Sequence, residues 1–215
     1  MLGFLSINNI RLNVVLFKFI VLKLSLDLTY NTPPEWANQV LDNFDTFLQD
    51  HADCERKASS MAMSFVAKCP DKIEIIPELI DTALEELEHF QMVYQLMEKR
   101  GVQLPQKMPK DHYVDDLIKL CRHTVEERLM DRMLLASIIE CRGAERFKLV
   151  ADAASDSEIK EFYKKLWISE AKHGHIFVKF ALNYWPEDEV FDRLETLNKA
   201  EGEICSSLEW RPALH

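Results

Sequence analysis

Residues 83–90 read ALEELEHF, and they place three glutamates and one histidine in a stretch that otherwise has the composition of a core helix. Apolar residues recur here every three or four positions, which is the spacing of a helix with one buried face. Glu86 falls on this apolar stripe, and His89 lies one turn further along the same side. Glu85 and Glu88 fall off the stripe and are expected to point away from it. The pattern therefore predicts one glutamate and one histidine in the protein interior.

Three other predicted helices carry a glutamate in the same kind of position. Glu170 is followed three residues later by His173, which repeats the Glu-x-x-His spacing. Glu55 and Glu140 each interrupt an apolar stripe of their own. Glu55 precedes Glu86 by 31 residues, and the second pair of glutamates is separated by 30 residues. The near-equal spacing indicates two related helical hairpins, as an internal duplication would produce.

A second glutamate competes for the place of Glu140. Glu145 lies five residues further along the same predicted helix, about 140° around its axis at 100° per residue, so the two cannot share one face. Glu145 would also shorten the spacing to Glu170 to 25 residues. Glu140 is therefore the predicted interior residue, and Glu145 is expected to flank the site or support it from outside.

Composition and the start and stop signals of helices predict an all-α fold. The chain has 215 residues, 47% of them hydrophobic, and only 5 glycines, which together favour helix over sheet and suffice for a sizeable core. The predicted helices run from the capping-box spacing Thr32–Glu35 to about Lys68, from about Glu74 to Arg100, from about Tyr113 to Ala151, from the capping-box spacing Ser155–Glu158 to about Trp185, and from Pro186 to about Ser206.

The lengths of the links predict how four of these helices are arranged. The first two helices and the next two are joined by short links, which give antiparallel hairpins. The link from Gly101 to about His112 spans about a dozen residues and can reach about 40 Å at ~3.4 Å per residue. It can cross the length of the bundle. We therefore predict a ferritin-like four-helix bundle with a long crossover between its second and third helices, and an extra C-terminal helix.

The two ends of the chain fall outside this bundle. Residues 1–30 are predicted to form an N-terminal extension, residues 31–206 the helical bundle, and residues 207–215 a C-terminal tail. Lys18 and Lys23 interrupt the apolar run near the N-terminus, so it is too short to span a membrane. No small-residue cleavage site follows it, which disfavours a signal peptide. Alternation over residues 22–30 suits a strand, but an irregular extension is the preferred interpretation.

Cysteine usage and charge restrict the possible functions. The five cysteines form no Cys-x-x-Cys pair, so a disulfide framework or a thiolate metal site is not indicated. They suit reduced thiols in the cytoplasm. The formal net charge of -10 argues against general binding of polyanions, whose phosphates are bound mainly by Lys and Arg.

The buried carboxylates require a compensating cation. Desolvating one carboxylate costs several kcal/mol, and several that converge also repel one another. One Glu from each of two helices and Glu-x-x-His from each of the other two is the ligand set of di-iron and di-manganese carboxylate bundles. Oxygen and imidazole ligands suit either metal. The predicted metal ligands are Glu55, Glu86, His89, Glu140, Glu170 and His173.

Four segments carry a family resemblance: DHADCERKA (50–58), EELEHF (85–90), IECRGAERF (139–147) and SEAKH (169–173). Over about residues 31–185 the chain resembles the tRNA 2-methylthio-N6-isopentenyladenosine hydroxylases. The resemblance implies a cytoplasmic, ferritin-like, non-haem di-iron monooxygenase with no membrane association. It implies two iron ions held by the same six residues, O2 as co-substrate and an external electron donor, which the sequence does not name. The implied partners are a tRNA with a prenylated adenosine and an electron-transfer reductase, and a monomer or dimer is favoured.

Several alternatives remain open at this point. A ferritin-like ferroxidase without an organic substrate would use the same ligands. If tRNA binds, the candidate basic contacts are Lys99, Arg100, Lys107 and Lys110 near the crossover, or Arg142 and Arg146 near the site. His51 lies one turn before Glu55 and either hydrogen-bonds near the site or is an ordinary core or surface histidine. Gly143 either opens space beside the metals or permits close helix packing.

Overall fold

The computed structural model describes residues 26–215, so the expectations for the first 25 residues lie outside it. Within this range every regular element is a helix. The helices are α2 (Glu35–Asp42), α3 (Phe44–Lys68), α4 (Ile76–Arg100), α5 (His112–Lys119), α6 (Val125–Ala153), α7 (Ser157–Leu182) and α8 (Glu187–Ser207). The predicted all-α fold is confirmed.

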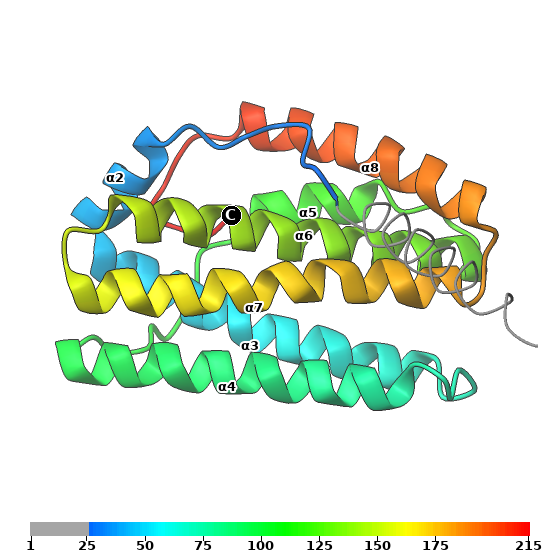
Figure 1. Cartoon of the computed structure of the whole chain (residues 1–215), viewed down its shortest axis with the longest axis horizontal. Helices are drawn as coiled ribbons and strands as arrows, with labels where there is room; N and C mark the ends of the chain where they lie inside the picture. Colours follow the sequence, from blue (N-terminus) through cyan, green and yellow to red (C-terminus); the bar gives the residue numbers. More distant parts are fainter. Residues whose placement is uncertain (1–25) are drawn as a thin grey trace, which may run out of the picture.

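Four long helices form the bundle. Helix α3 packs mainly against α4, and α6 packs mainly against α7, which gives two antiparallel hairpins. Figure 1 shows that α4 and α6 run in the same direction, so the chain between them crosses the length of the bundle. This crossover is the predicted ferritin-like connection. Helix α8 covers α6 as the predicted extra helix.

The first predicted helix is in fact two helices, because the chain bends at Asn43. Its backbone leaves the helical region (φ -127°, ψ 40°), and its side-chain amide donates to the carbonyl of Gln39 at 3.1 Å. Asparagine competes with helix in this way through local side-chain bonds. The bend lets Trp36 and Val40 of α2 reach the core beside α6.

The third predicted helix is also two helices, α5 and α6. The backbone N–H of Glu127 donates to the hydroxyl of Thr124 at 3.3 Å, and that hydroxyl donates to the Glu127 carboxylate at 2.6 Å. Thr124 is therefore the N-cap of α6, with the Thr-x-x-Glu spacing of a capping box. This spacing is a start signal inside the predicted third helix. Helix α5 consequently belongs to the crossover.

The predicted cap at Thr32 is wrong. Pro34 occupies the N-cap position of α2, while the backbone N–H and the hydroxyl of Thr32 donate to the Glu145 carboxylate of α6 at 2.6 and 2.8 Å. A tertiary partner has replaced the local one. At α7 the cap is Asp156, one residue after the predicted Ser155, and its carboxylate accepts from two backbone N–H groups.

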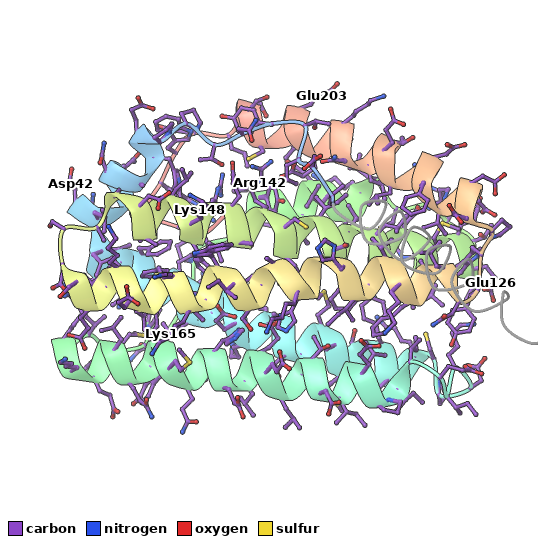
Figure 2. The ribbon with its side chains drawn as sticks, viewed as in Figure 1. Asp42, Glu126, Arg142, Lys148, Lys165 and Glu203 are labelled. Carbon is purple, nitrogen blue, oxygen red and sulfur yellow. The ribbon has the colours of Figure 1, made fainter. Side chains whose placement is uncertain are left out.

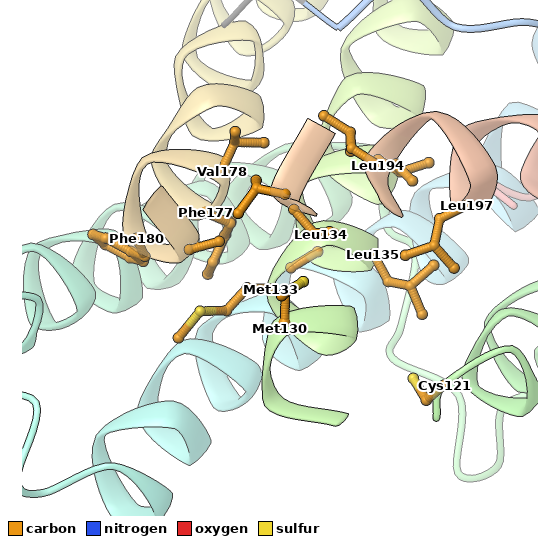
Figure 3. Close-up of a cluster of buried hydrophobic side chains, with 14 of the residues drawn as sticks. Cys121, Met130, Met133, Leu134, Leu135, Phe177, Val178, Phe180, Leu194 and Leu197 are labelled. Atoms are coloured by element: carbon orange, nitrogen blue, oxygen red, sulfur yellow. The ribbon is translucent and has the colours of Figure 1, made fainter. Parts of the chain in front are cut away.

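Buried apolar side chains form two clusters, one towards each end of the bundle. One contains Trp36, Phe47, Phe147 and Tyr163. The other contains the α6 and α7 residues drawn in Figure 3, where Met133 and Phe177 belong to one packed group. Each of the four long helices contributes to both clusters. The middle of each helix lies between them.

Arg142 is a buried connector between the bundle and its covering segments. It lies on the side of α6 towards α8 (Figure 2) and is fully buried. Its guanidinium donates to Glu201 of α8 at 2.8 and 2.9 Å, to Glu145 at 2.7 Å and to the carbonyl of Tyr30 at 2.9 Å. Arg142 therefore serves the fold, and its side chain is not available to contact tRNA.

Among residues 26–215, no helix combines the length and the apolar character needed to cross a membrane.

Candidate metal centre

The predicted ligands occupy the gap between the two apolar clusters. On α3, Glu55 lies between Ala52 of one cluster and Phe65 of the other. On α6, Glu140 lies between Ile138 and Phe147 in the same way. Glu86 and His89 of α4 and Glu170 and His173 of α7 lie at the same level of the bundle. All six side chains are buried, as the helical periodicity of the sequence predicts.

The six residues form two overlapping groups. The first group comprises Glu55, Glu86, His89 and Glu170, and the second comprises Glu86, Glu140, Glu170 and His173. Within each group the potential ligand atoms all lie within 4.8 Å of one another. Such spacing suits one cation per group. Glu86 and Glu170 belong to both groups, and we call them the shared carboxylates.

The shared carboxylates present one oxygen to each histidine. His89 Nδ1 lies 2.8 Å from Glu170 Oε1 and 3.6 Å from Glu86 Oε2. His173 Nδ1 lies 2.6 Å from Glu86 Oε1 and 3.3 Å from Glu170 Oε2. The two imidazole rings are 5.8 Å apart. This arrangement is that of two ligand sets joined by a pair of carboxylates.

Without a metal, protons have to balance the converging charges. Burial, together with the neighbouring carboxylates, raises the pKa of Glu55 and of Glu140 well above the usual range. Burial would lower the pKa of both histidines, but the close approach of the negatively charged shared carboxylates raises it to about 9 for His89 and about 12 for His173. Divalent cations would replace these protons, since ligands must be deprotonated to bind metal.

Buried polar atoms without partners show that the residues fit a bound metal. Both oxygens of Glu86, Oε1 of Glu170 and Nδ1 of His89 are buried and make no hydrogen bond of acceptable geometry. Buried groups left unsatisfied in this way cost about 1–3 kcal/mol each, more when charged. All four atoms face the two ligand groups. Hard oxygen and imidazole donors without thiolate suit iron or manganese.

Glu85 supports the site, contrary to the prediction that it points away. Its carboxylate lies 2.8 Å from Nε2 of His173, although its side chain is 53% exposed. Metal-binding histidines typically donate the second ring N–H to a carboxylate, which fixes the orientation of the ring. The apolar stripe could not reveal this contact, because Glu85 reaches across from α4 to α7 at the edge of the stripe.

His51 contacts Glu55 but belongs to neither ligand group. Its Nε2 lies 2.6 Å from Glu55 Oε1, and its Nδ1 lies 3.1 Å from the hydroxyl of Tyr163. Burial lowers the pKa of His51 to about 3, so the ring is neutral and can donate one N–H to the carboxylate. His51 is thus both a core residue and a partner of a candidate ligand.

A cleft leads from the surface to the ligand groups. Its volume is about 780 Å³, and it lies between α3, the crossover with α5, and α6. Glu140 lies on its wall together with apolar residues that include Met61, Leu135 and Ile139. A second cavity of about 40 Å³, here called the inner chamber, is lined by Glu55, Glu140, Glu170 and Gly143. Gly143 therefore borders open space beside the candidate ligands.

The fold and the site define a ferritin-like helical protein whose buried Glu and His cluster fits a di-iron centre. A solved structure with a similar fold is a Synechococcus protein described as protein 43 with aldehyde deformylating oxygenase activity. It has a TM-score of 0.83 and 32% identity, over 87% of this chain and 94% of that chain.

Sequence comparison then assigns the family. Residues 20–215 match the family model of tRNA-(MS[2]IO[6]A)-hydroxylase (MiaE), and the chain belongs to this family. The tRNA 2-(methylsulfanyl)-N(6)-isopentenyladenosine(37) hydroxylase of Pseudomonas putida is 34% identical, over 86% of this chain and 89% of the relative. The Salmonella typhimurium protein of the same name is 24% identical, over 82% of each chain.

Proposed function

We propose that this protein hydroxylates the isopentenyl group of 2-methylthio-N6-isopentenyladenosine in tRNA. In this reaction one prenyl C–H bond and the O–O bond of O2 break. One oxygen atom becomes the new hydroxyl group and the other leaves as water. Two electrons and two protons from an external reductant complete the balance, and an electron-transfer reductase is the expected donor. The substrate makes the cytoplasm the expected compartment.

The observation that carries this proposal is the cleft that ends at Glu140. Ferroxidase chemistry needs only a path for ions, whereas a volume of about 780 Å³ is in the range of pockets that enclose organic ligands. Its wall is mainly apolar towards the bundle interior, where Met61, Leu135 and Ile139 line it. A hydrocarbon chain attached to a purine base matches this polarity.

The residues of this chain have distinct roles in the proposed reaction. Two iron ions held by the six predicted residues would supply the activation of O2. Glu86 and Glu170 would contribute to both ligand groups, whereas Glu55 and Glu140 would each contribute to one. Glu85 orients the His173 ring, and the flanking apolar clusters exclude water from both ends of the site.

Nucleoside analysis tests the proposed function. Iron-loaded protein is incubated with reductant, O2 and tRNA that contains the prenylated adenosine, and the digested nucleosides are examined by mass spectrometry. We expect the prenylated nucleoside to gain one oxygen atom, and tRNA without the prenyl group to remain unchanged. Oxidation of iron without any oxygenated nucleoside would contradict the proposal and favour a ferroxidase.

We infer a basic surface for the RNA other than the crossover cations that the sequence suggests. Of those four cations, three form ion pairs with carboxylates of the chain, namely Lys99, Arg100 and Lys110. Arg132 of α6 lines the cleft, and Arg128 of α6 and Lys68 of α3 are close enough to interact with it or with each other electrostatically. These three cations are here called the cation triad. Within residues 26–215, no carboxylate forms an ion pair with any of them.

The cation triad is placed to receive phosphates. Burial lowers the pKa of Lys68, and the neighbouring charges of Arg132 and Arg128 lower it further. Arg132 also lines the cleft. A base that enters a pocket leaves its phosphates at the rim, where cations fix the register of the nucleic acid. An acidic protein can therefore bind RNA through this local surface.

Removing two charges of the triad tests this surface. For the double variant Lys68→Gln/Arg128→Gln, we expect the dissociation constant for a prenylated anticodon stem-loop to rise about tenfold. The slope of the logarithm of the binding constant against the logarithm of the salt concentration should become shallower by about one unit for each lost phosphate contact. Binding is measured on iron-loaded protein without reductant. The control Lys148→Gln/Lys199→Gln removes two cations that are paired with Asp152 and Glu195. Equal weakening in both variants would show that only net charge matters.

A further inference from the structure

We propose that the side chain of His215 separates the cleft from the inner chamber and contacts the purine of the substrate, so that only the prenyl chain reaches the metal centre. This inference rests on the proposed function and assigns a specificity-determining role to a residue in the segment that follows α8.

The segment 208–215 folds back onto the bundle. In Figure 1 it descends from α8 and ends beside α6, in the middle of the molecule. The backbone N–H of Leu214 donates to the Asp50 carboxylate of α3 at 2.7 Å. The guanidinium of Arg146 on α6 donates to the carbonyl of Leu214. Earlier in the segment, the carbonyl of Trp210 accepts from Gln39 at 3.0 Å. These contacts fix the segment directly before His215.

The His215 ring is held by stacking. It lies against the ring of Tyr113 with centroids 4.7 Å apart and planes at 9° to each other. The Tyr113 hydroxyl donates to Glu201 at 2.9 Å, and Glu201 is bound to Arg142. The buried network that joins α6 and α8 therefore also positions the imidazole.

His215 belongs to the walls of both cavities. It lines the cleft and also the inner chamber, together with Cys54, Ala58, Ile139 and Glu140. The inner chamber, at about 40 Å³, has room for a few atoms such as O2 or a prenyl methyl group, whereas a purine ring needs the larger cleft. The imidazole thus lies where a substrate would change from its polar ring to its hydrocarbon chain.

The ring nitrogen of His215 has an unused hydrogen-bonding capacity. Its Nδ1 is buried and makes no hydrogen bond. Burial, and next Arg146 and Arg142, hold the pKa of His215 well below the usual range, so the ring is neutral. A neutral imidazole nitrogen either donates or accepts, depending on the tautomer. The amine and the ring nitrogens of a prenylated adenine supply either partner.

These contacts set the depth to which a substrate enters. The purine would be stopped by the fixed imidazole and bound through Nδ1, while the thin prenyl chain passes towards Glu140. Depth decides which prenyl carbon lies beside the metals. His215 therefore determines both the affinity for the base and the position that is hydroxylated.

Three substitutions separate the two parts of this role. His215→Phe keeps a ring that can stack on Tyr113 but removes the hydrogen bond, His215→Asn keeps a polar group in a smaller side chain, and His215→Ala removes both. The control is Glu209→Ala, an exposed position in the same segment. The probe is the nucleoside 2-methylthio-N6-isopentenyladenosine, with its dissociation constant measured on iron-loaded protein without reductant.

For His215→Phe we expect binding to weaken about tenfold, the effect of one lost hydrogen bond in a dry site, with partial recovery in His215→Asn. For His215→Ala we expect products hydroxylated at more than one prenyl carbon. We also expect less hydroxylated nucleoside per reductant consumed. Iron content should match the wild type and Glu209→Ala in all three.

Unchanged affinity and unchanged product distribution in His215→Phe and His215→Ala would overturn the inference. So would a loss of iron that accounts for the whole effect in each variant. If the wild-type protein binds the nucleoside but never oxygenates it, the proposed function fails, while the affinity measurements still decide the contact of His215 with the base.

Discussion

The variant Glu140→Ala is expected to lose its hydroxylase activity and to retain about one iron ion per chain in place of two. Glu140 belongs only to the group that contains His173, whereas the shared carboxylates serve both groups. Removing it leaves that group with three residues, and the other group with all four of its own. Metal analysis of protein reconstituted with iron under anaerobic conditions measures the loss. Nucleoside analysis measures the activity.

Glu145→Ala is the matched control for this experiment, since it removes a glutamate from the same helix. Glu145 binds Thr32 and Arg142 rather than the ligand groups. We expect a stability loss of about 1 kcal/mol, the usual scale for a lost hydrogen-bonded contact, with about two iron ions retained. Loss of iron in Glu145→Ala with full loading in Glu140→Ala would contradict the assignment of the ligand on α6.

Arg142→Met is expected to destabilise the fold by about 3–5 kcal/mol, because it leaves the carboxylate of Glu201 buried without its cation. Arg142 and Glu201 are both fully buried. The substitution also removes the bond to the carbonyl of Tyr30, which joins the segment before α2 to the bundle. Urea unfolding of the metal-free protein gives the free energy of unfolding, since bound metal would add its own contribution.

Lys148→Met on the same helix is the control for this prediction. Lys148, labelled in Figure 2, is exposed and forms an ion pair with Asp152, and exposed pairs of this kind contribute little. Its unfolding free energy should remain within about 0.5 kcal/mol of the wild type. A similar small change for Arg142→Met would show that the buried network is not important for stability.

The ligand layer was predictable because it depends on local periodicity. Glu86 and His89 lie on one face of a helix whatever their neighbours are, and a buried carboxylate has few explanations other than a cation. The spacings of 31 and 30 residues between the glutamates of each hairpin then indicate that the four glutamates lie at one level along the bundle. The breaks at Asn43 and Thr124 do not follow from the apolar stripe, since a short bend changes few of its positions.

The residues around this layer were not predictable in the same way. Arg142 and Arg146 looked like surface cations, yet both are buried by the segments that cover α6. Glu85 appeared to face solvent, but it reaches the second ring nitrogen of a histidine 88 residues away. Long polar side chains find partners according to which elements pack beside them, and helical spacing carries no information about that choice.

The sequence by itself determined the all-α fold, the crossover and the six candidate ligands, because helix periodicity and the energy of buried charge act within a few turns of the chain. Only the tertiary structure decided which carboxylates are shared, where the cleft opens and that His215 lies between the two cavities. These features arise where α3, α6, the crossover and the segment after α8 meet. Their contacts join residues distant in sequence, so no local pattern encodes them.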